Sequence, residues 1–381
     1  MRKSGVYSPQ LGERNTVSTN LDGLRISFLA GSLGQGGAER QLMHMLRALQ
    51  SRGSILSVLS LTQGEFWESQ IEAMGIPVTW VGQPSAQPLR LHRIVSELLR
   101  HKPDVVQSCH CFTNAYVAAA ARLTGIREVG AIRSDTRQTV SGRFAAIRMW
   151  SLRHLRSIAV NSRASLQTAI EYGVRPNRLF HLPNVVDTGQ FFPSRPVISN
   201  DGLVRLLAVG RLTPEKRFDR LLRALATLPP DVRATVRASI AGDGPMRSLL
   251  EQQVLQLGLH DSVRFLGPQA EMAPIYREFD LLALTSDSEG SPNVVLEAMA
   301  SGLPVLGTRT GGVAELVDHG VTGLLARPSD EAALAVALET LIRDSGLRQR
   351  MGARARDRAL LTHSQASLPR SLGNLYEMAL T

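Results

Sequence analysis

Two glutamates eight positions apart are the residues of this chain best suited to holding a polar ligand. Glu289 lies in a Gly-Ser-Pro turn, and Glu297 lies among nonpolar residues in the stretch EGSPNVVLEAMASGLPV (289–305). Ser291 and Pro292 are typical of a helix N-cap and a first helical residue, so a helix should begin within this stretch. Glu297 then either faces solvent on the one polar stripe of that helix or binds a ligand.

The first turn of this expected helix is suited to an anion. Backbone amides near Asn293 and Val294 can bind a phosphate, because the first N–H groups of a helix have no partner within it. Glu289 could accept hydrogen bonds from the hydroxyls of a sugar, and Glu297 from the diol of a ribose. Two carboxylates beside an anion site fit a nucleotide-sugar, whereas the alternative leaves Glu289 as a partner of the helix dipole alone.

Two cations precede these carboxylates along the chain. The segment VGRLTPEKRFDRLL (209–222) places Arg211 just after a strand and Lys216 at the start of a helix, where both could contact a diphosphate. Lys216 is one of only three lysines among 43 basic residues, which favours a role for its compact charge. With Arg217 and Arg220 nearby, a cluster of surface charges is equally consistent with the pattern.

Three glycine-bearing turns each follow an expected strand. They are GSLGQGGAERQL (31–42), IAGDGP (240–245) and TRTGG (308–312). Backbone amides in such turns can approach a phosphate closely, and the amides expected to do so belong to Gly36, Gly37, Gly311 and Gly312. Asp243, between two glycines, is equally suited to a structural turn and to a ligand contact.

The first of these turns lacks two common nucleotide fingerprints. A dinucleotide fingerprint needs a third glycine where Glu39 stands, and an acidic residue near the end of the second strand, yet residues 55–64 contain none. A P-loop needs a lysine after its glycines, and Ala38 follows them here. Dehydrogenase and NTPase functions are therefore disfavoured.

An alternation of short apolar strands and helices must position these residues. The expected strands span residues 24–30, 54–61, 76–81, 104–108, 127–132, 157–161, 178–183, 204–210, 235–242, 262–267, 280–285, 303–308 and 321–326. Such alternation predicts α/β domains with doubly wound parallel sheets, and it occurs twice along the chain. Because ligands bind at the carboxyl ends of parallel strands, we expect the site in the cleft between the two domains.

The domain boundaries follow from composition. We expect a flexible polar tail at 1–23, a first α/β domain at 24–190 and a proline-bearing linker at 191–203. A second α/β domain should span 204–365, and a C-terminal helix at 366–381 could pack back on the first domain. The polar tail carries no apolar run of the kind found in secretory signals, so the cytoplasm is the expected location.

Charge and cysteine content narrow the classes of function. Through residue 198 there are 23 Lys and Arg against 12 Asp and Glu, a net charge of +11; from residue 199 onward the counts are 20 and 21, a net charge of −1. The first half should therefore meet an anionic partner, either nucleic acid or a membrane surface. Cys109, His110 and Cys111 are too close in sequence for a disulfide framework or a typical metal site, so no metal is expected.

Taken together, these segments resemble the retaining GT-B glycosyltransferases of the family-4 group. The resemblance covers essentially residues 24–380. The motifs that carry it are GGAER (36–40), GRLTPEK (210–216), AGDGP (241–245), EGSPNVVLEAMASGLPV (289–305) and GGVAELV (311–317). It implies the GT-B fold, in which two Rossmann-like domains face each other across a cleft.

The resemblance also implies roles for individual residues. Arg211 and Lys216 would neutralise the donor's diphosphate, Glu297 would hold the ribose and Glu289 the donor sugar. Amides around Gly36 and Gly37 would complete the phosphate pocket from the other domain. Family members transfer the sugar with retention and usually without a bound metal, so we expect no cofactor.

One departure from the family pattern lies at the end of the fifth strand. Many members have a histidine there that approaches the donor sugar, whereas this chain reads AIRSD (131–135), so Arg133 occupies that place. Asp135, two residues on, is a further candidate for the acceptor or sugar side. His110, just after the fourth strand, is an alternative residue for this side of the cleft. A structural role for this histidine is equally consistent with the sequence.

The acceptor should bind the basic first domain, as it does in the family. The segment SGRFAAIRMWSLRHLRSI (141–158) reads as a basic amphipathic helix that could lie on an anionic membrane surface, or could be the cationic outer face of a core helix. We expect a peripheral enzyme that extends a lipid-linked saccharide at the cytoplasmic face, and a UDP-sugar is the favoured donor.

Other functions compete with this expectation. A nucleotide-sugar epimerase or a sugar phosphorylase could use the same two-domain plan. The positive charge alone would also allow a nucleic-acid-binding protein. The basic residues, however, lack the interleaved aromatic residues of a base-stacking surface, so no nucleic acid is expected.

Overall fold

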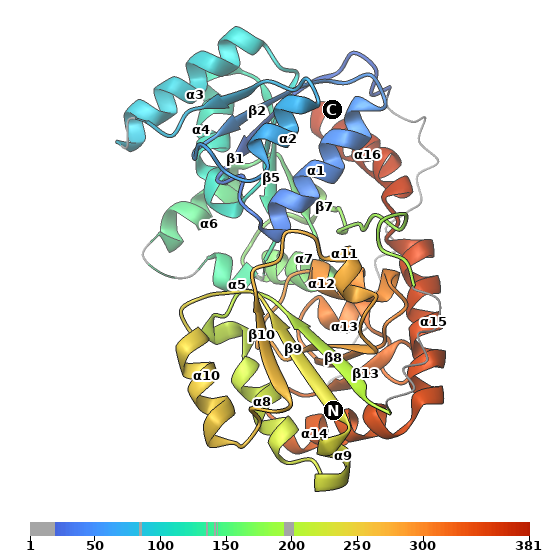
Figure 1. The fold of residues 1–381 in the computed structure, drawn as a ribbon. Helices are drawn as coiled ribbons and strands as arrows, with labels where there is room; N and C mark the ends of the chain where they lie inside the picture. Colours follow the sequence, from blue (N-terminus) through green and yellow to red (C-terminus); the bar gives the residue numbers. More distant parts are fainter. Residues whose placement is uncertain (1–19, 84–85, 135, 141, 143, 194–201) are drawn as a thin grey trace, which may run out of the picture.

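The computed structural model describes residues 20–381 except 84–85, 135, 141, 143 and 194–201. Most of the expected N-terminal tail, most of the expected linker and the predicted site residue Asp135 therefore lie outside the described residues. The described chain forms two parallel sheets, one above the other in Figure 1.

The first sheet has seven parallel strands in the order β3-β2-β1-β4-β5-β6-β7. The strands are β1 (Arg25–Ala30), β2 (Ile55–Ser60), β3 (Val78–Trp80), β4 (Val105–Ser108), β5 (Arg127–Ile132), β6 (Ser157–Val160) and β7 (Leu179–His181). In β1, every residue after Arg25 is buried, as expected of a parallel sheet covered on both faces. The strand order reverses between β1 and β4, where such sheets bind ligands.

The second sheet has six parallel strands in the order β10-β9-β8-β11-β12-β13. The strands are β8 (Val204–Val209), β9 (Val236–Ala241), β10 (Val263–Gly267), β11 (Leu281–Leu284), β12 (Val305–Thr308) and β13 (Gly323–Ala326). Its order reverses between β8 and β11. Two doubly wound parallel sheets confirm the predicted fold class.

Helices connect the strands and cover both faces of each sheet (Figure 1). In the first domain they are α1 (Gly37–Gln50), α2 (Glu68–Ala73), α3 (Gln87–His101), α4 (Asn114–Thr124), α5 (Thr136–Thr139), α6 (Ala145–His154) and α7 (Arg163–Glu171), with 3₁₀ turns η1 (Cys111–Thr113) and η2 (Pro176–Arg178). In the second part of the chain they are η3 (Pro214–Lys216), α8 (Phe218–Ala226), α9 (Pro230–Ala234), α10 (Arg247–Gln256), α11 (Ala273–Tyr276), α12 (Asn293–Ala300), α13 (Val313–Leu316), α14 (Glu331–Arg343), α15 (Ser345–Thr362), η4 (Gln365–Ser367) and α16 (Leu368–Leu380).

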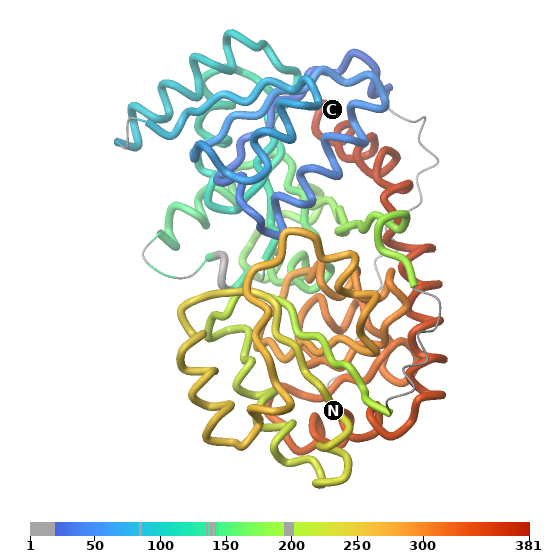
Figure 2. The backbone as a smooth tube through the Cα atoms, viewed as in Figure 1, coloured from blue at the N-terminus to red at the C-terminus, as the bar shows by residue number. Residues whose placement is uncertain are grey.

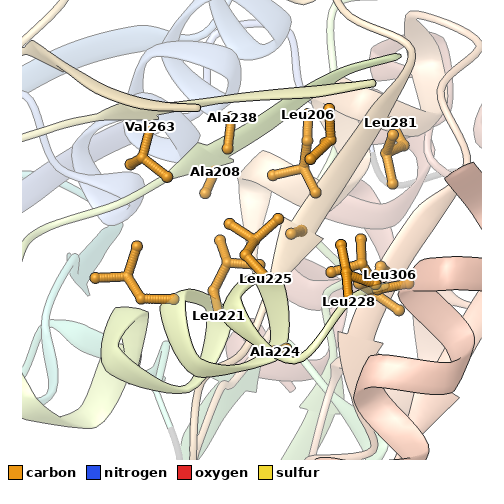
Figure 3. Packing of buried hydrophobic residues seen from close by; sticks show 14 of the residues in the cluster. Leu206, Ala208, Leu221, Ala224, Leu225, Leu228, Ala238, Val263, Leu281 and Leu306 are labelled. Atoms are coloured by element: carbon orange, nitrogen blue, oxygen red, sulfur yellow. The ribbon is translucent and has the colours of Figure 1, made fainter. Parts of the chain in front are cut away.

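Helical periodicity explains which face of each helix is buried. In α1, the residues Leu42, Met45, Leu46 and Leu49 recur at helical spacing and all are buried in the first core. In α8, Leu221 and Leu225 lie one turn apart and point toward the strands of the second sheet (Figure 3). Burying each such leucine contributes on the order of 2 kcal/mol, which anchors the helices that lead into the cleft.

The C-terminal helix crosses from the second domain to the first. Figure 2 shows the red end of the chain rising along the second domain and ending beside the first. Leu372, Leu375 and Tyr376 of α16 are buried in the same core as α1. The Tyr376 hydroxyl also donates to Oε1 of Gln107 in β4 over 2.6 Å. The C-terminal segment thus joins the second domain to the first by contacts of its own.

Three local predictions need correction. Pro292, not Ser291, is the N-cap of α12, because the chain is still extended at Pro292. No side chain caps this helix, since the proline side chain has no hydrogen-bonding group. Lys216 ends the 3₁₀ turn η3 instead of starting a helix, since Arg217 adopts a left-handed conformation before α8 begins.

The helix expected over 141–158 is also shorter than predicted. It spans only Ala145–His154, because residues from Ser157 onward join the sheet as β6. Residues 141 and 143 lie outside the described part of the chain. None of the helices that the structure describes is long and apolar enough to cross a membrane.

Candidate active site between the two sheets

The carboxyl ends of the two sheets approach each other closely. The Asn293 side chain at the start of α12 donates to the backbone carbonyl of Gly37 at the start of α1 over 2.9 Å. At Gly290 there is no room for a side chain, because a Cβ there would lie 2.9 Å from the Cα of Ser134. Loops at the carboxyl ends of the two sheets are therefore in direct contact at these two points.

Lys216 and Glu289 form an ion pair at the edge of the second sheet. The Lys216 ammonium donates to Oε1 of Glu289 over 2.6 Å, and the Ser286 hydroxyl donates to the same oxygen over 2.7 Å. Lys216 retains partial exposure, whereas Glu289 is largely buried. The sequence placed these two residues 73 positions apart, and the fold brings them into contact through neighbouring strands β8 and β11.

Arg211 differs from the arginines that follow it. Arg217 and Arg220 bind carboxylates within the second domain, including Asp287 at 3.0 and 2.7 Å. Burial alone would raise the pKa of Asp287, but hydrogen bonds from Arg220 and Arg217 lower it below its usual value. Arg211 is exposed in the same loop, and among the described residues its side chain has no ion-pair partner. The ion-pair network therefore uses Arg217 and Arg220 and leaves Arg211 available to a ligand.

Two glycine turns pack against each other beneath Lys216. A Cβ at Gly242, whose φ is +134°, would lie 2.0 Å from the carbonyl oxygen of Gly210. The side chain of Asp243 accepts a hydrogen bond from the backbone amide of Gly244 over 2.8 Å. The Asp243 carbonyl also accepts from Leu212. Asp243 is thus engaged in the turn, in agreement with the structural alternative for this aspartate.

Gly311 and Gly312 support the loop that carries Glu289. The Gly312 amide donates to the Glu289 carbonyl over 3.2 Å, so this amide is already satisfied and does not face a phosphate as predicted. A Cβ at Gly312 would lie 1.6 Å from the carbonyl oxygen of Gly290, and one at Gly311 would lie 2.3 Å from that of Glu289. The lack of side chains here allows two loops to touch.

Glu297 does not face solvent, which excludes the polar-stripe alternative. Its side chain is only 3% exposed. One carboxylate oxygen accepts from the guanidinium of Arg40 in the first domain, and the other accepts from the Tyr276 hydroxyl over 3.0 Å. Burial and the neighbouring Glu297 charge raise the pKa of Tyr276, so this hydroxyl remains a donor. The same carboxylate raises the pKa of Arg40.

The first amides of α12 remain open to an anion. The amides of Asn293 and Val294 have no acceptor among the residues that the structure describes. The Val294 carbonyl accepts from Tyr276 over 3.2 Å, and the Ser291 carbonyl accepts from Asn184 over 2.8 Å. Hydrogen bonds to these two carbonyl groups therefore fix the backbone of the turn.

Glu39 lies at the edge of the first sheet, beside His110. Its side chain folds over Gly36 and accepts from the Ser32 hydroxyl and, over 3.0 Å, from Nε2 of His110. Nδ1 of His110 accepts from the Gly31 amide at 3.0 Å, which leaves Nε2–H to donate to Glu39. Burial would raise the pKa of Glu39, but these hydrogen bonds lower it overall. His110 is thus oriented at the cleft by a carboxylate.

Arg133 lies in a polar network at the base of the cleft. Its guanidinium donates to Oδ1 of Asn184 over 3.4 Å, and Asn184 in turn donates to Oδ1 of Asn293 over 2.8 Å. Gln41 of α1 also contacts Asn293, over 3.2 Å. Burial lowers the pKa of Arg133, because no carboxylate contacts its guanidinium among the described residues. The network joins both domains. Of its side chains, the sequence predicted Arg133 and Asn293 as site residues but not Asn184 or Gln41.

Sequence reasoning missed Arg40, Tyr276, Asn184 and Gln41. Arg40 is the last residue of the motif GGAER, but no pattern in the sequence connects it with Glu297, which lies 257 residues further along the chain. Tyr276 lies in a short helix with no recognisable motif. Only contacts between distant segments identify these residues.

Comparisons with known proteins cover most of the chain. Residues 35–190 match the family model described as Glycosyltransferase Family 4, and residues 194–358 match that of Glycosyl transferases group 1. The D-inositol 3-phosphate glycosyltransferase of Frankia alni is 33% identical over 71% of this chain and 75% of its own length. The lipopolysaccharide core biosynthesis glycosyltransferase LpsE of Rhizobium meliloti is 27% identical over 84% of this chain and 90% of its own length.

Solved structures resemble most of this chain. HepE of Anabaena, solved in complex with UDP and glucose, superposes with a TM-score of 0.83 at 25% identity and covers 93% of this chain and 99% of its own. Two further curated relatives match at 37% and 36% identity, but the chain spans only 19% and 39% of their length. Similarity therefore extends along both domains, while the extent shared with each relative varies.

Proposed function

Because this chain belongs to the family-4 glycosyltransferases with the GT-B fold, we propose that it transfers a sugar from a UDP-sugar to a saccharide or a lipid-linked saccharide, with retention of configuration and without a bound metal. The observation that carries this proposal is the pair Lys216–Glu289 beside an exposed Arg211 and the open first amides of α12. These groups would receive a nucleoside diphosphate in the cleft.

The proposed chemistry depends on stabilising a leaving group. As the bond between the sugar C1 and the diphosphate breaks, negative charge develops on the diphosphate oxygen. Lys216 and the amides at Asn293 and Val294 would stabilise that charge with little reorganisation, because the fold holds them in place beforehand. The exposed Arg211 would add its charge when the donor binds. The acceptor hydroxyl would form the new C1–O bond on the same face, and its proton would pass to the departing phosphate oxygen.

Glu289 and Glu297 would position the donor. Glu289 is held by Ser286 and Lys216 and would accept from a hydroxyl of the donor sugar. Glu297 would accept from the ribose diol. The choice of a uridine nucleotide draws on HepE, which was solved with UDP and glucose. The saccharide acceptor draws on the name of LpsE, a lipopolysaccharide core biosynthesis glycosyltransferase.

A thermal-shift screen tests the donor. A ligand that binds only the native state raises the melting temperature, by an amount that grows with ligand concentration over Kd. UDP-glucose, UDP-galactose, UDP-N-acetylglucosamine, GDP-mannose and ADP-glucose should be compared at equal concentration, with and without EDTA. We expect a UDP-sugar to give the largest shift, unchanged by EDTA. A flat response to all five would contradict the proposal.

A surface on α6 supports the proposed acceptor on a membrane. We call the exposed side chains Phe144, Ile147 and Trp150 the α6 patch. Ile147 and Trp150 lie three residues apart on one face of α6, and Phe144 is the N-cap residue of this helix. The Arg122 guanidinium lies 5.2 Å from the Trp150 ring, and Arg153 of the same helix is exposed. Exposed apolar and aromatic side chains together with nearby arginines are suited to an anionic lipid surface.

Flotation with liposomes tests the α6 patch. We expect the protein to float with vesicles containing phosphatidylglycerol and to remain in solution with neutral phosphatidylcholine vesicles. The variant Trp150→Ser should lose most of this binding, whereas Leu361→Ser, an exposed leucine on α15 of the other domain, should retain it. Failure of the wild type to float with either vesicle would refute the membrane association and leave the donor site untouched.

A further inference from the structure

The carboxylate proposed to bind ribose is already occupied in the structure. One oxygen of Glu297 accepts from Tyr276, which is completely buried, and the other accepts from Arg40. Of these three side chains only Arg40 has substantial exposure, at 28% against 3% for Glu297. Arg40 is therefore the member of this group that lies on the solvent side.

A ribose and Arg40 would compete for the same oxygen of Glu297. Tyr276 approaches from the core, where no ligand can enter, so a ligand must approach from the side of Arg40. A guanidinium and a vicinal diol present the same chemistry to a carboxylate, namely two adjacent hydrogen-bond donors. With an exposed fraction of 3%, the Glu297 carboxylate has no room for both.

Arg40 is suited to leave when a ligand arrives. It belongs to α1 of the first domain, whereas Glu297 belongs to α12 of the second. Among the described residues, no other hydrogen bond of the Arg40 side chain accompanies the one to Glu297. A long, partly exposed side chain with one hydrogen-bond partner can rotate into water without breaking a second hydrogen bond.

We propose that Arg40 occupies the ribose position on Glu297 in the free enzyme and that the nucleotide's ribose displaces it. The inference rests on the proposed function, because it takes Glu297 as the ribose-binding residue. Donor binding would then break the ion pair that joins α1 to α12 and replace it with a contact to the ligand. The affinity for the nucleotide would be lower than the site's contacts alone provide, because the pair must be broken first.

Calorimetric titration with UDP tests this exchange. The variant Arg40→Met removes the competitor and leaves Glu297 buried with Tyr276 alone, so UDP should bind about tenfold more tightly than to wild type. The matched control is Arg47→Met, which removes the same charge from an exposed position on the same helix and should leave the affinity unchanged. Equal or weaker binding of UDP to Arg40→Met would overturn the inference.

A second ligand shows whether the ribose itself is responsible. 2′,3′-Dideoxy-UDP keeps the base and the diphosphate but lacks the diol, so it has no reason to displace Arg40. We expect no gain for this ligand in Arg40→Met. An equal gain with both ligands would show that the substitution acts on the site as a whole, and the exchange would be refuted.

Folding and the proposed function are tested separately. Arg40→Lys keeps the positive charge with a single donor group, and it should fold as wild type and bind UDP with an affinity between those of wild type and Arg40→Met. If wild type binds no nucleoside diphosphate, the proposed function fails and the inference with it. If wild type binds UDP and the two Arg40 variants gain nothing, the inference alone fails.

Discussion

Glu289 and Glu297 lie eight residues apart on one loop and helix, yet they have different partners. Glu289 pairs with Lys216, a residue of its own domain, and is supported by Ser286. Glu297 pairs with Arg40 of the opposite domain and with Tyr276 of its own. One carboxylate is thus held by a contact that forms when its domain folds, and the other by a contact that depends on how the two domains are placed.

Contacts within the second domain therefore position Glu289, whereas the contact of Glu297 with Arg40 links the two domains. The Lys216–Glu289 pair lies among other internal pairs, such as Arg220 with Asp287, so its geometry is fixed by the second sheet. The Arg40–Glu297 pair belongs to the interface, together with Asn293 and Gly37. A ligand in the cleft should therefore rearrange the second kind of contact more easily than the first.

The largest expected effect comes from removing a charged side chain of either ion pair, Lys216–Glu289 or Arg40–Glu297. Lys216→Ala and Glu297→Ala should each lower the rate of sugar transfer by two to three orders of magnitude, because each removes a charged group held against the substrate. Initial rates with a UDP-sugar donor measure this. Glu251→Ala, which removes an exposed carboxylate on α10, is the control and should transfer normally. Wild-type turnover in both site variants would disprove the assignment.

Stability at low pH should reveal a buried histidine on the first domain whose charged form is disfavoured by burial. Burial is the largest cause that lowers the pKa of His44 in α1, to about 4 from 6.5, and its Nδ1 has no partner among the described residues. Below pH 6.5 the unfolded chain binds a proton that the native protein takes up only near pH 4. The free energy of unfolding should therefore fall as pH falls through this window, by up to about 3 kcal/mol.

Urea denaturation at several pH values measures this dependence. In His44→Gln the decline between pH 6.5 and pH 4 should be smaller by that amount, whereas His92→Gln, at an exposed position on α3, should follow the wild type. A decline of the same size in His44→Gln and wild type would assign the effect to other groups.

An intermediate effect is expected at the edge of the first sheet. Glu39→Gln weakens the hydrogen bonds that hold His110 and the Ser32 hydroxyl at the cleft, so transfer should fall by about tenfold, the equivalent of one charge-assisted hydrogen bond. Steady-state kinetics measure the change. Glu72→Gln, on the exposed face of α2, should have no effect. Unchanged kinetics in Glu39→Gln would restrict this glutamate to a structural role.

The smallest expected effect compares two caps of one helix. The N-terminus of α7 is capped within its domain by Ser162, whose hydroxyl accepts from the Ser165 amide over 3.1 Å. It is also capped across the interface by Glu315, which accepts from the amides of Arg163 and Ala164 at 2.8 and 2.5 Å. Ser162→Ala and Glu315→Ala should each cost about 1 kcal/mol of stability.

The two cap variants should differ in one respect. Hydrogen exchange of the α7 amides should increase in both, but only Glu315→Ala should also increase exchange at the interface, for example at the start of α13. If Ser162→Ala had the same effect on α13, the distinction between contacts within a domain and contacts between domains would not hold for this helix.

Much of the fold was predictable because its signals are local. Apolar strand runs such as 24–30 and the helical spacing of Leu42, Met45, Leu46 and Leu49 each depend on residues close in sequence. The predictions failed where a single residue's backbone conformation decided the boundary. Arg217 adopts φ +51° and ends η3, so Lys216 does not begin a helix.

The place of the candidate site at the strand ends was predictable from the sequence, but the contacts of its side chains were not. The types and spacing of Arg211, Lys216, Glu289 and Glu297 indicated an anionic, hydroxyl-bearing ligand, because side-chain chemistry and strand ends can be read along the chain. The pairing of Glu297 with Arg40 could not be read, nor the packing of Gly312 against Gly290.

The sequence by itself determined the two-sheet architecture, the sheet edge expected to bind ligands and the residue types proposed to contact a diphosphate, since each depends on local periodicity or on residue chemistry. Only the tertiary structure decided that Glu297 is buried, that Arg211 is left without an ion-pair partner among the described residues, and that Arg40 reaches across the cleft. The physical reason is that these properties arise from packing between segments as far as 257 residues apart. The local pattern of one segment does not show which distant segment will pack against it.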